Sequence, residues 1–171
     1  MNFRIATKDD LKELDKLVNS AYRGDSSRKG WTTEADLLGG VRTSQESLNE
    51  MISKTNAVIL IAEEEEMEGC VFLEQQGKAL YLGMLTVRPD LQGKGIGAKL
   101  MAASEERAKE LGCNSIRMTV ITDRNELIAY YKRKGFEDTG ERAPFPDDPK
   151  FGLPKKPLQF MVMEKTLSDQ K

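Results

Sequence analysis

Histidine is absent from the sequence, which removes the side chain that most often acts as a general base near neutral pH and most often binds transition metals. Cysteine is scarce, since only Cys70 and Cys113 occur, far apart and outside any Cys-x-x-Cys spacing. We therefore expect neither a metal site nor a disulfide framework, and we interpret both cysteines as buried, unreactive thiols.

Long apolar runs and an excess of positive charge are also missing. With 39% hydrophobic and 32% charged residues, the composition is that of a soluble globular protein and is too polar for a membrane span. The first residues contain no apolar core of signal-peptide length, so we expect a cytoplasmic protein without membrane partners. A net charge of −2 provides no basic surface for nucleic acid, so a bound anion requires a local site.

The 171 residues suffice for one domain with its own core, and no linker-like stretch divides them, so we expect a single domain over residues 1–171. Apolar patterns predict an α+β fold with seven strands. The strands are expected at residues 3–6, 57–62, 70–74, 80–87, 115–121, directly after Phe136, and at 158–165.

Helices are predicted from apolar residues at helical spacing and from capping pairs. The capping pairs are Thr7 with Asp10, Thr43 with Glu46, and Asp123 with Glu126; a further helix, residues 96–111, ends at Gly112. This helix lies between the strands 80–87 and 115–121, so we expect those strands to be parallel, while 57–62, 70–74 and 80–87 run antiparallel.

A glycine-rich turn, QGKGIGA at residues 92–98, leads from strand 80–87 into that helix. The first amides of a helix are unpaired and carry the positive end of its dipole, so such a turn suits a pyrophosphate. Arg88, Lys94 and Lys99 can add positive charge around it. A tight turn without any ligand would need the same glycines, so this alternative stays open.

Other phosphate motifs fit less well. The P-loop string is absent, whereas Gly93, Gly95 and Ala98 satisfy the Gly-x-Gly-x-x-Ala fingerprint of dinucleotide-binding oxidoreductases. That fingerprint should follow the first strand of an alternating β-α-β fold, and here several antiparallel strands come first.

The string QGKGIG at residues 92–97 matches the Gln/Arg-x-x-Gly-x-Gly/Ala signature of the GNAT superfamily of acyl-CoA-dependent N-acyltransferases, and LTVRP at 85–89 precedes it as in that family. A second block of the family matches at Asn125, Ala129, Tyr131, Gly135 and Phe136. The chain thus resembles the GNAT superfamily over nearly its whole length. The resemblance implies a three-layer α/β arrangement, with a mixed seven-stranded sheet and helices on both faces.

The resemblance also implies acetyl-CoA as co-substrate. Its pyrophosphate would lie on the amides of the glycine turn, and its pantetheine arm would bond the main chain of strand 80–87. The implied cofactor-binding residues are Leu85, Val87, Gln92, Gly93, Lys94, Gly95, Ile96, Gly97, Ala98 and Asn125.

Tyr131 matches the tyrosine that supplies a proton to the departing thiolate in this family; a tyrosine packed in the core is the alternative. Many members carry a glutamate base where this chain has YLGM at residues 81–84. Glu34, Asp36 and Glu74 are the candidates here, besides a water chain to solvent.

The substrate is expected between residues 23–40 and 143–157, where Trp31 forms an apolar wall and Glu34 or Asp36 holds a cationic amine. We therefore expect an N-acetyltransferase that acts on a primary amine of a small molecule or a protein. A non-catalytic acyl-CoA-binding module is the alternative. The last strand, residues 158–165, is expected to be exposed and able to pair across a homodimer.

Overall fold

The structure, a computed structural model, describes residues 1–22, 38–39, 43–144, 153–154 and 158–167. One mixed sheet has the strand order β1-β3-β4-β5-β6-β9-β7. Its strands are β1 (Asn2–Ile5), β3 (Ala57–Glu63), β4 (Met67–Gln76), β5 (Ala79–Val87), β6 (Ser115–Ile121), β7 (Glu137–Pro144) and β9 (Gln159–Thr166). Two short strands, β2 (Leu38–Gly39) and β8 (Leu153–Pro154), pair separately.

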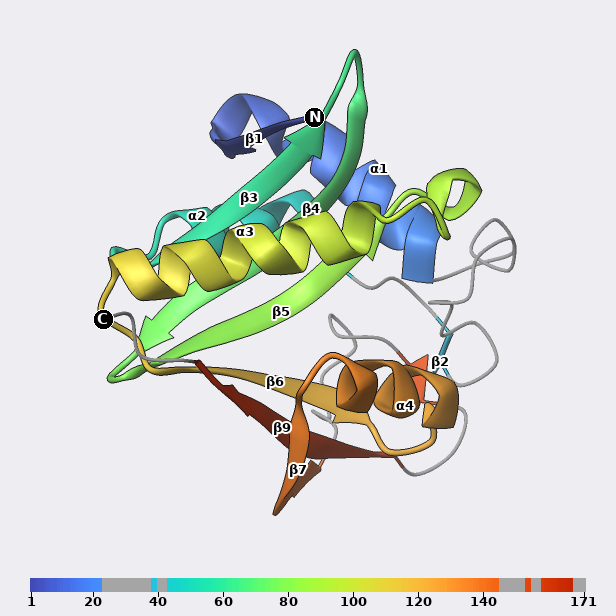
Figure 1. The fold of residues 1–171 in the computed structure, drawn as a ribbon. Helices are drawn as coiled ribbons and strands as arrows, with labels where there is room; N and C mark the ends of the chain where they lie inside the picture. Colours follow the sequence, from blue (N-terminus) through green and yellow to red (C-terminus); the bar gives the residue numbers. More distant parts are fainter. Residues whose placement is uncertain (23–37, 40–42, 145–152, 155–157, 168–171) are drawn as a thin grey trace.

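The α-helices of the described part cover both faces of the sheet (Figure 1). They are α1 (Leu11–Tyr22), α2 (Gln45–Ile52), α3 (Ile96–Glu110) and α4 (Asn125–Arg133). None of the helices in the described ranges is both long and apolar enough to cross a bilayer. The expected mixed seven-stranded sheet between two helical layers is confirmed.

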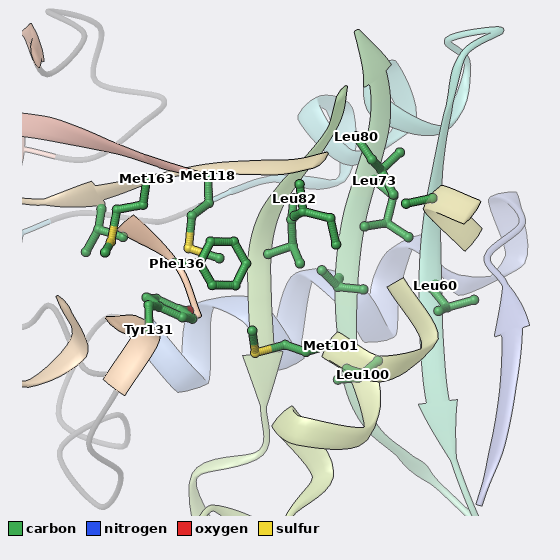
Figure 2. Packing of buried hydrophobic residues seen from close by; sticks show 14 of the residues in the cluster. Leu60, Leu73, Leu80, Leu82, Leu100, Met101, Met118, Tyr131, Phe136 and Met163 are labelled. Carbon is green, nitrogen blue, oxygen red and sulfur yellow. The ribbon is translucent and has the colours of Figure 1, made fainter. Parts of the chain in front are cut away.

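Two apolar clusters fill the space between the layers, because successive residues of a strand point to opposite faces. In β3, Leu60 packs into the cluster with α3 and α4, and Ile59 packs into the cluster with α1 and α2. Figure 2 shows the first cluster, in which Met101 of α3 and Tyr131 of α4 pack together with strand residues such as Leu82. Burial of β3 on both faces explains its uninterrupted apolar run.

The strands β3, β4 and β5 run antiparallel, and β5 and β6 run parallel, as predicted. This is not the alternating β-α-β arrangement that a dinucleotide-binding oxidoreductase requires before its glycine turn. Both cysteines are buried as predicted, and burial raises the pKa of the Cys113 thiol.

The parallel strands β5 and β6 separate toward their carboxyl ends (Figure 1). They pair only from Ala79 and Ser115 to Tyr81 and Arg117 within these two fully described strands. Beyond this point β5 follows β4 as far as Val87, and β6 follows β9. A wedge-shaped opening therefore forms in the middle of the sheet.

A β-bulge lies in β5 beside this opening. The partners Cys70–Thr86 and Phe72–Gly83 enclose one residue on β4 but two on β5, Met84 and Leu85. Met84 has a φ of 54°, and its carbonyl accepts a hydrogen bond of 2.8 Å from the Thr86 hydroxyl. A bulge re-aims the backbone that follows it, here the segment that reaches the glycine turn.

Two predicted helix starts are wrong by one residue. The N-cap of α2 is Ser44, whose hydroxyl accepts a hydrogen bond of 3.1 Å from the Ser47 amide. Thr43 is buried instead, and its amide donates to the Asn19 side chain of α1. The N-cap of α4 is Arg124 rather than Asp123.

The prediction of an exposed last strand is also wrong. β9 lies between β6 and β7 and pairs with both. The chain passes to the edge of the sheet as β7 before it returns as β9, so β7 is the edge strand at this end. All its residues except Ala143 are exposed, and they include the ion pair Arg142–Asp138 of 2.9 Å.

Candidate active site

The glycine turn joins the open end of β5 to α3 through a short 3-10 turn, η3 (Pro89–Leu91). The Gln92 side-chain amide donates a hydrogen bond of 3.1 Å to the Val87 carbonyl, which holds the turn against the strand end. The N-cap of α3 is Gly95, which has no side chain to accept from the first amides of the helix. These amides and the positive end of the helix dipole therefore face out of the helix.

The backbone of the turn requires glycine. Gly93 and Gly95 have φ values of 88° and 85°, a conformation that other residues rarely adopt. A Cβ atom placed on either residue would meet no heavy atom of the described ranges within 4 Å. The described residues leave the space above Gly93 and Gly95 open, so a ligand can approach the main chain closely.

A cavity of about 250 Å³ lies between this turn, the end of β5 and one face of α4. Nine of the residues expected at the site line it: Leu85, Val87, Gln92, Gly93, Gly95, Ile96, Gly97, Ala98 and Tyr131. Two other expected residues, Lys94 and Asn125, do not line it. Lys94 is exposed in the glycine turn, and Asn125 is exposed at the start of α4.

Four lining residues were not predicted: Leu91, Leu127, Tyr130 and Lys134. Leu127 and Tyr130 share one face of α4 with Tyr131, and the C-cap Lys134 continues it, because the positions 127, 130, 131 and 134 follow helical spacing. Helical periodicity around Tyr131 is the signal that would have found them.

Tyr131 is 7% exposed and belongs both to the core and to the cavity wall. Its ring packs edge to face against Phe136 at 5.9 Å and against Tyr130 at 5.4 Å between centroids. Lys134 places its ammonium 5.5 Å from the centre of the Tyr130 ring, and burial raises the pKa of Tyr130. Packing therefore fixes the position of Tyr131 on the wall of the cavity.

Positive charge near the turn is partly neutralised. Arg88 forms ion pairs with Asp90 at 2.7 Å and with Glu66 at 3.2 Å. Its hydrogen bond to Asp90 raises the pKa of Arg88 and lowers the pKa of Asp90. The helix dipole of α3 and the cavity-lining Lys134 remain as sources of positive potential at this site.

The candidates for a general base lie elsewhere or outside the described residues. Glu74 pairs with Lys54 at 3.0 Å and is opposite Tyr81 on β5. That position is four residues before Leu85, about 13 Å along the strand. Trp31, Glu34 and Asp36 lie outside the described residues.

The short strands β2 and β8 connect the two segments between which the substrate is expected. Leu38 pairs with Pro154, and Gly39 pairs with Leu153. Residues 23–40 and 143–157 are therefore joined by an antiparallel pair, although they are far apart in the sequence.

The family model described as "Acetyltransferase (GNAT) domain" matches residues 35–145, more than half of the chain. Thialysine N-epsilon-acetyltransferase of Bos taurus is 32% identical over 66 residues, which span 39% of each chain. IAA acetyltransferase of Azospirillum brasilense is 21% identical over 86% of this chain and 88% of its own length. The structure of yncA from Salmonella typhimurium, determined with its cofactor acetyl-CoA, superposes with a TM-score of 0.69 at 18% identity, over 100% of this chain and 96% of that one.

These matches agree with the motifs and with the mixed sheet that opens between β5 and β6. The chain belongs to the GNAT family of acetyltransferases.

Proposed function

We propose that this protein is an N-acetyltransferase that moves an acetyl group from acetyl-CoA directly to a primary amine. The observation that carries the proposal is the cavity, which extends from the uncapped N-terminus of α3 to Tyr131 at the opening between β5 and β6. We also propose that residues 1–171 act as one domain, because β1 and β9 belong to the same sheet.

The two ends of the cavity suit the two parts of coenzyme A. The amides that follow Gly95 and the dipole of α3 favour a pyrophosphate, and the open space above Gly93 and Gly95 allows it to contact the main chain. Leu85, Val87 and the α4 face offer an apolar wall to the pantetheine arm. The complex of yncA with acetyl-CoA supports this choice of co-substrate.

In the proposed reaction the amine nitrogen attacks the thioester carbonyl, the carbon–sulfur bond breaks, and the thiolate needs a proton. Tyr131 lines the cavity and is assigned as the proton donor. A phenol with a pKa of about 10 remains protonated at neutral pH and can protonate a thiolate as it leaves. A main-chain amide of β5 near Leu85 would polarise the carbonyl.

The amine must lose a proton as well. Glu74 is held in an ion pair with Lys54. We therefore propose that Glu34, or water that leads to solvent, accepts this proton. Asp36 and Trp31 are proposed to contact the substrate. The pair of β2 and β8 supports a substrate site between the segments that carry these residues. The name of the Bos taurus relative, thialysine N-epsilon-acetyltransferase, favours an amine acceptor. We propose that the acceptor is a small molecule or a protein.

Calorimetry with acetyl-CoA and an assay of thiol release across a panel of amines test the proposal together. Binding at micromolar concentrations and turnover with at least one amine are expected. In Tyr131→Phe the turnover should fall about 100-fold, the usual contribution of one general acid, with unchanged affinity for acetyl-CoA. Absence of acetyl-CoA binding would contradict the proposal.

A second candidate is a non-catalytic acyl-CoA-binding module. It is favoured by one observation, since no Asp or Glu of the described ranges lines the cavity. Tight binding of acetyl-CoA without turnover for any amine would support this candidate. A strong loss of turnover in Tyr131→Phe with intact binding would exclude it.

A further inference from the structure

Tyr81 lies where β5 and β6 begin to separate. Tyr81 and Arg117 are the last partners of this parallel pair, and both strands continue without pairing to each other. The Tyr81 hydroxyl lies 3.4 Å from the Thr119 hydroxyl, two residues further along β6. The Tyr81 side chain therefore bridges the two strands just beyond their last main-chain contact.

The ring of Tyr81 also lies over Gly83. A Cβ atom on Gly83 would be 2.8 Å from a ring carbon of Tyr81 and 3.2 Å from its hydroxyl oxygen, closer than a side chain tolerates. Gly83 is not among the residues with a positive φ, so backbone conformation does not demand glycine here. The missing side chain instead gives the Tyr81 ring room to lean along β5 toward the opening.

A third contact fixes the ring from behind. Tyr81 packs edge to face against Phe72 of β4, with 6.3 Å between the centroids, at the margin of the cluster formed with α1 and α2. Phe72, Gly83 and Thr119 together hold the ring at the narrow end of the opening. Its partial exposure agrees with a position on the wall of a gap rather than inside the core.

We propose that Tyr81 is the end wall of the acyl site and restricts the donor to short acyl groups such as acetyl. This inference rests on the proposed function, in which the coenzyme arm enters at the wide end of the opening and the thioester lies near Leu85. The Tyr81 backbone lies about 13 Å before Leu85, but its ring extends over Gly83, only two residues before Leu85. An acyl chain that extends from Leu85 toward the narrow end therefore approaches this ring, although Tyr81 does not line the cavity itself. Longer acyl chains need the volume that the ring fills.

The test compares acetyl-, propionyl- and butyryl-CoA as donors with the wild-type chain, Tyr81→Leu and Tyr81→Phe. Leucine shortens the side chain but keeps an apolar contact for Phe72, whereas phenylalanine keeps the ring and removes only the hydroxyl. In Tyr81→Leu the ratio of kcat/KM for butyryl-CoA to that for acetyl-CoA should rise at least tenfold. In Tyr81→Phe it should stay within twofold of the wild-type ratio.

Calorimetry with coenzyme A and with each acyl-CoA gives a readout that does not need turnover. Tyr81→Leu should bind coenzyme A like the wild type and bind butyryl-CoA more tightly. The inference is overturned if the wild-type chain has the same kcat/KM for butyryl-CoA as for acetyl-CoA. It is also overturned if Tyr81→Leu lowers kcat/KM equally for all donors. If wild-type protein binds neither coenzyme A nor acetyl-CoA, the proposed function itself fails.

A double-mutant cycle tests the contact by stability alone. Gly83→Ala should lower the unfolding midpoint in the wild-type chain, because its Cβ meets the Tyr81 ring. In the Tyr81→Leu background, Gly83→Ala should lower the unfolding midpoint by less than half as much. Equal costs in both backgrounds would mean that the ring does not occupy the space over Gly83, which overturns the inference.

Discussion

The role of the glycine turn is tested by replacing Gly95 with alanine. Gly95 has a φ of 85°, and a Cβ there meets no atom of the described residues within 4 Å, so we expect the cost to the free protein to be backbone strain. Placing a non-glycine residue in this region costs about 1–2 kcal/mol. For a domain of this size each kcal/mol lowers the melting temperature by about 2–4 °C.

In Gly95→Ala the affinity for coenzyme A should fall by more, in free energy, than the stability of the fold. The new methyl group would occupy the open space above the turn, so the pyrophosphate could no longer approach the amides that begin α3. Loss of one hydrogen bond to a charged group costs about 1.5–3 kcal/mol. Since about 1.4 kcal/mol corresponds to a tenfold change, the dissociation constant should rise about 10- to 150-fold.

Gly112 supplies the matched control at the other end of the same helix. Its φ is 75°, and a Cβ there also meets no atom of the described part of the chain within 4 Å, so Gly112→Ala carries the same kind of strain. The 15 residues of α3, a helix about 22 Å long, lie between Gly112 and Gly95. Urea unfolding should show similar losses for both variants, and calorimetry should show weaker binding for Gly95→Ala only. Equal affinities in the two variants would refute an anion site at this turn.

Two further predictions concern charged groups. Arg88→Gln should change the affinity for coenzyme A by less than threefold in calorimetry, because Asp90 and Glu66 already neutralise the guanidinium; a tenfold loss would contradict this. The hydrogen bonds from Arg4 lower the pKa of Asp10, so this stabilisation is present above the unfolded pKa of about 3.9 and is lost as the pH falls through the folded value. Asp10→Asn should therefore be less stable at pH 7 and should lose less stability between pH 5 and 2, as measured by urea unfolding; an unchanged acid profile would contradict this.

The positions of the strands along the chain followed from the sequence because burial on both faces leaves uninterrupted apolar runs, as in β3. The directions of β3, β4, β5 and β6 also followed, whereas the place of β9 between β6 and β7 did not. The glycine turn could also be predicted, since a positive φ favours glycine and both Gly93 and Gly95 are therefore recognisable in the sequence. The bulge in β5 was not visible. It places a methionine, Met84, at a φ of 54°, and nothing in the local sequence requires that conformation. The exact cap of α2 was missed because contacts with Asn19, a distant residue, decide whether Thr43 or Ser44 begins the helix.

Features set by the local sequence could be predicted, and features set by contacts between distant residues could not. This difference explains why the cofactor end of the site was easier to predict than the acceptor end. A site built from main-chain amides constrains the sequence only through backbone conformation, and here those constraints fall on a few glycines within one short turn. The wall of the cavity depends instead on side chains from α4 that meet β5 only after folding, although Leu127, Tyr130 and Lys134 share a helix face with Tyr131. The narrow end depends on Tyr81 leaning over Gly83 to reach Thr119, a contact between two strands that no spacing in one segment encodes. Substitutions at Tyr81 and Gly83 should therefore alter the choice of donor while the glycine turn keeps its affinity for coenzyme A.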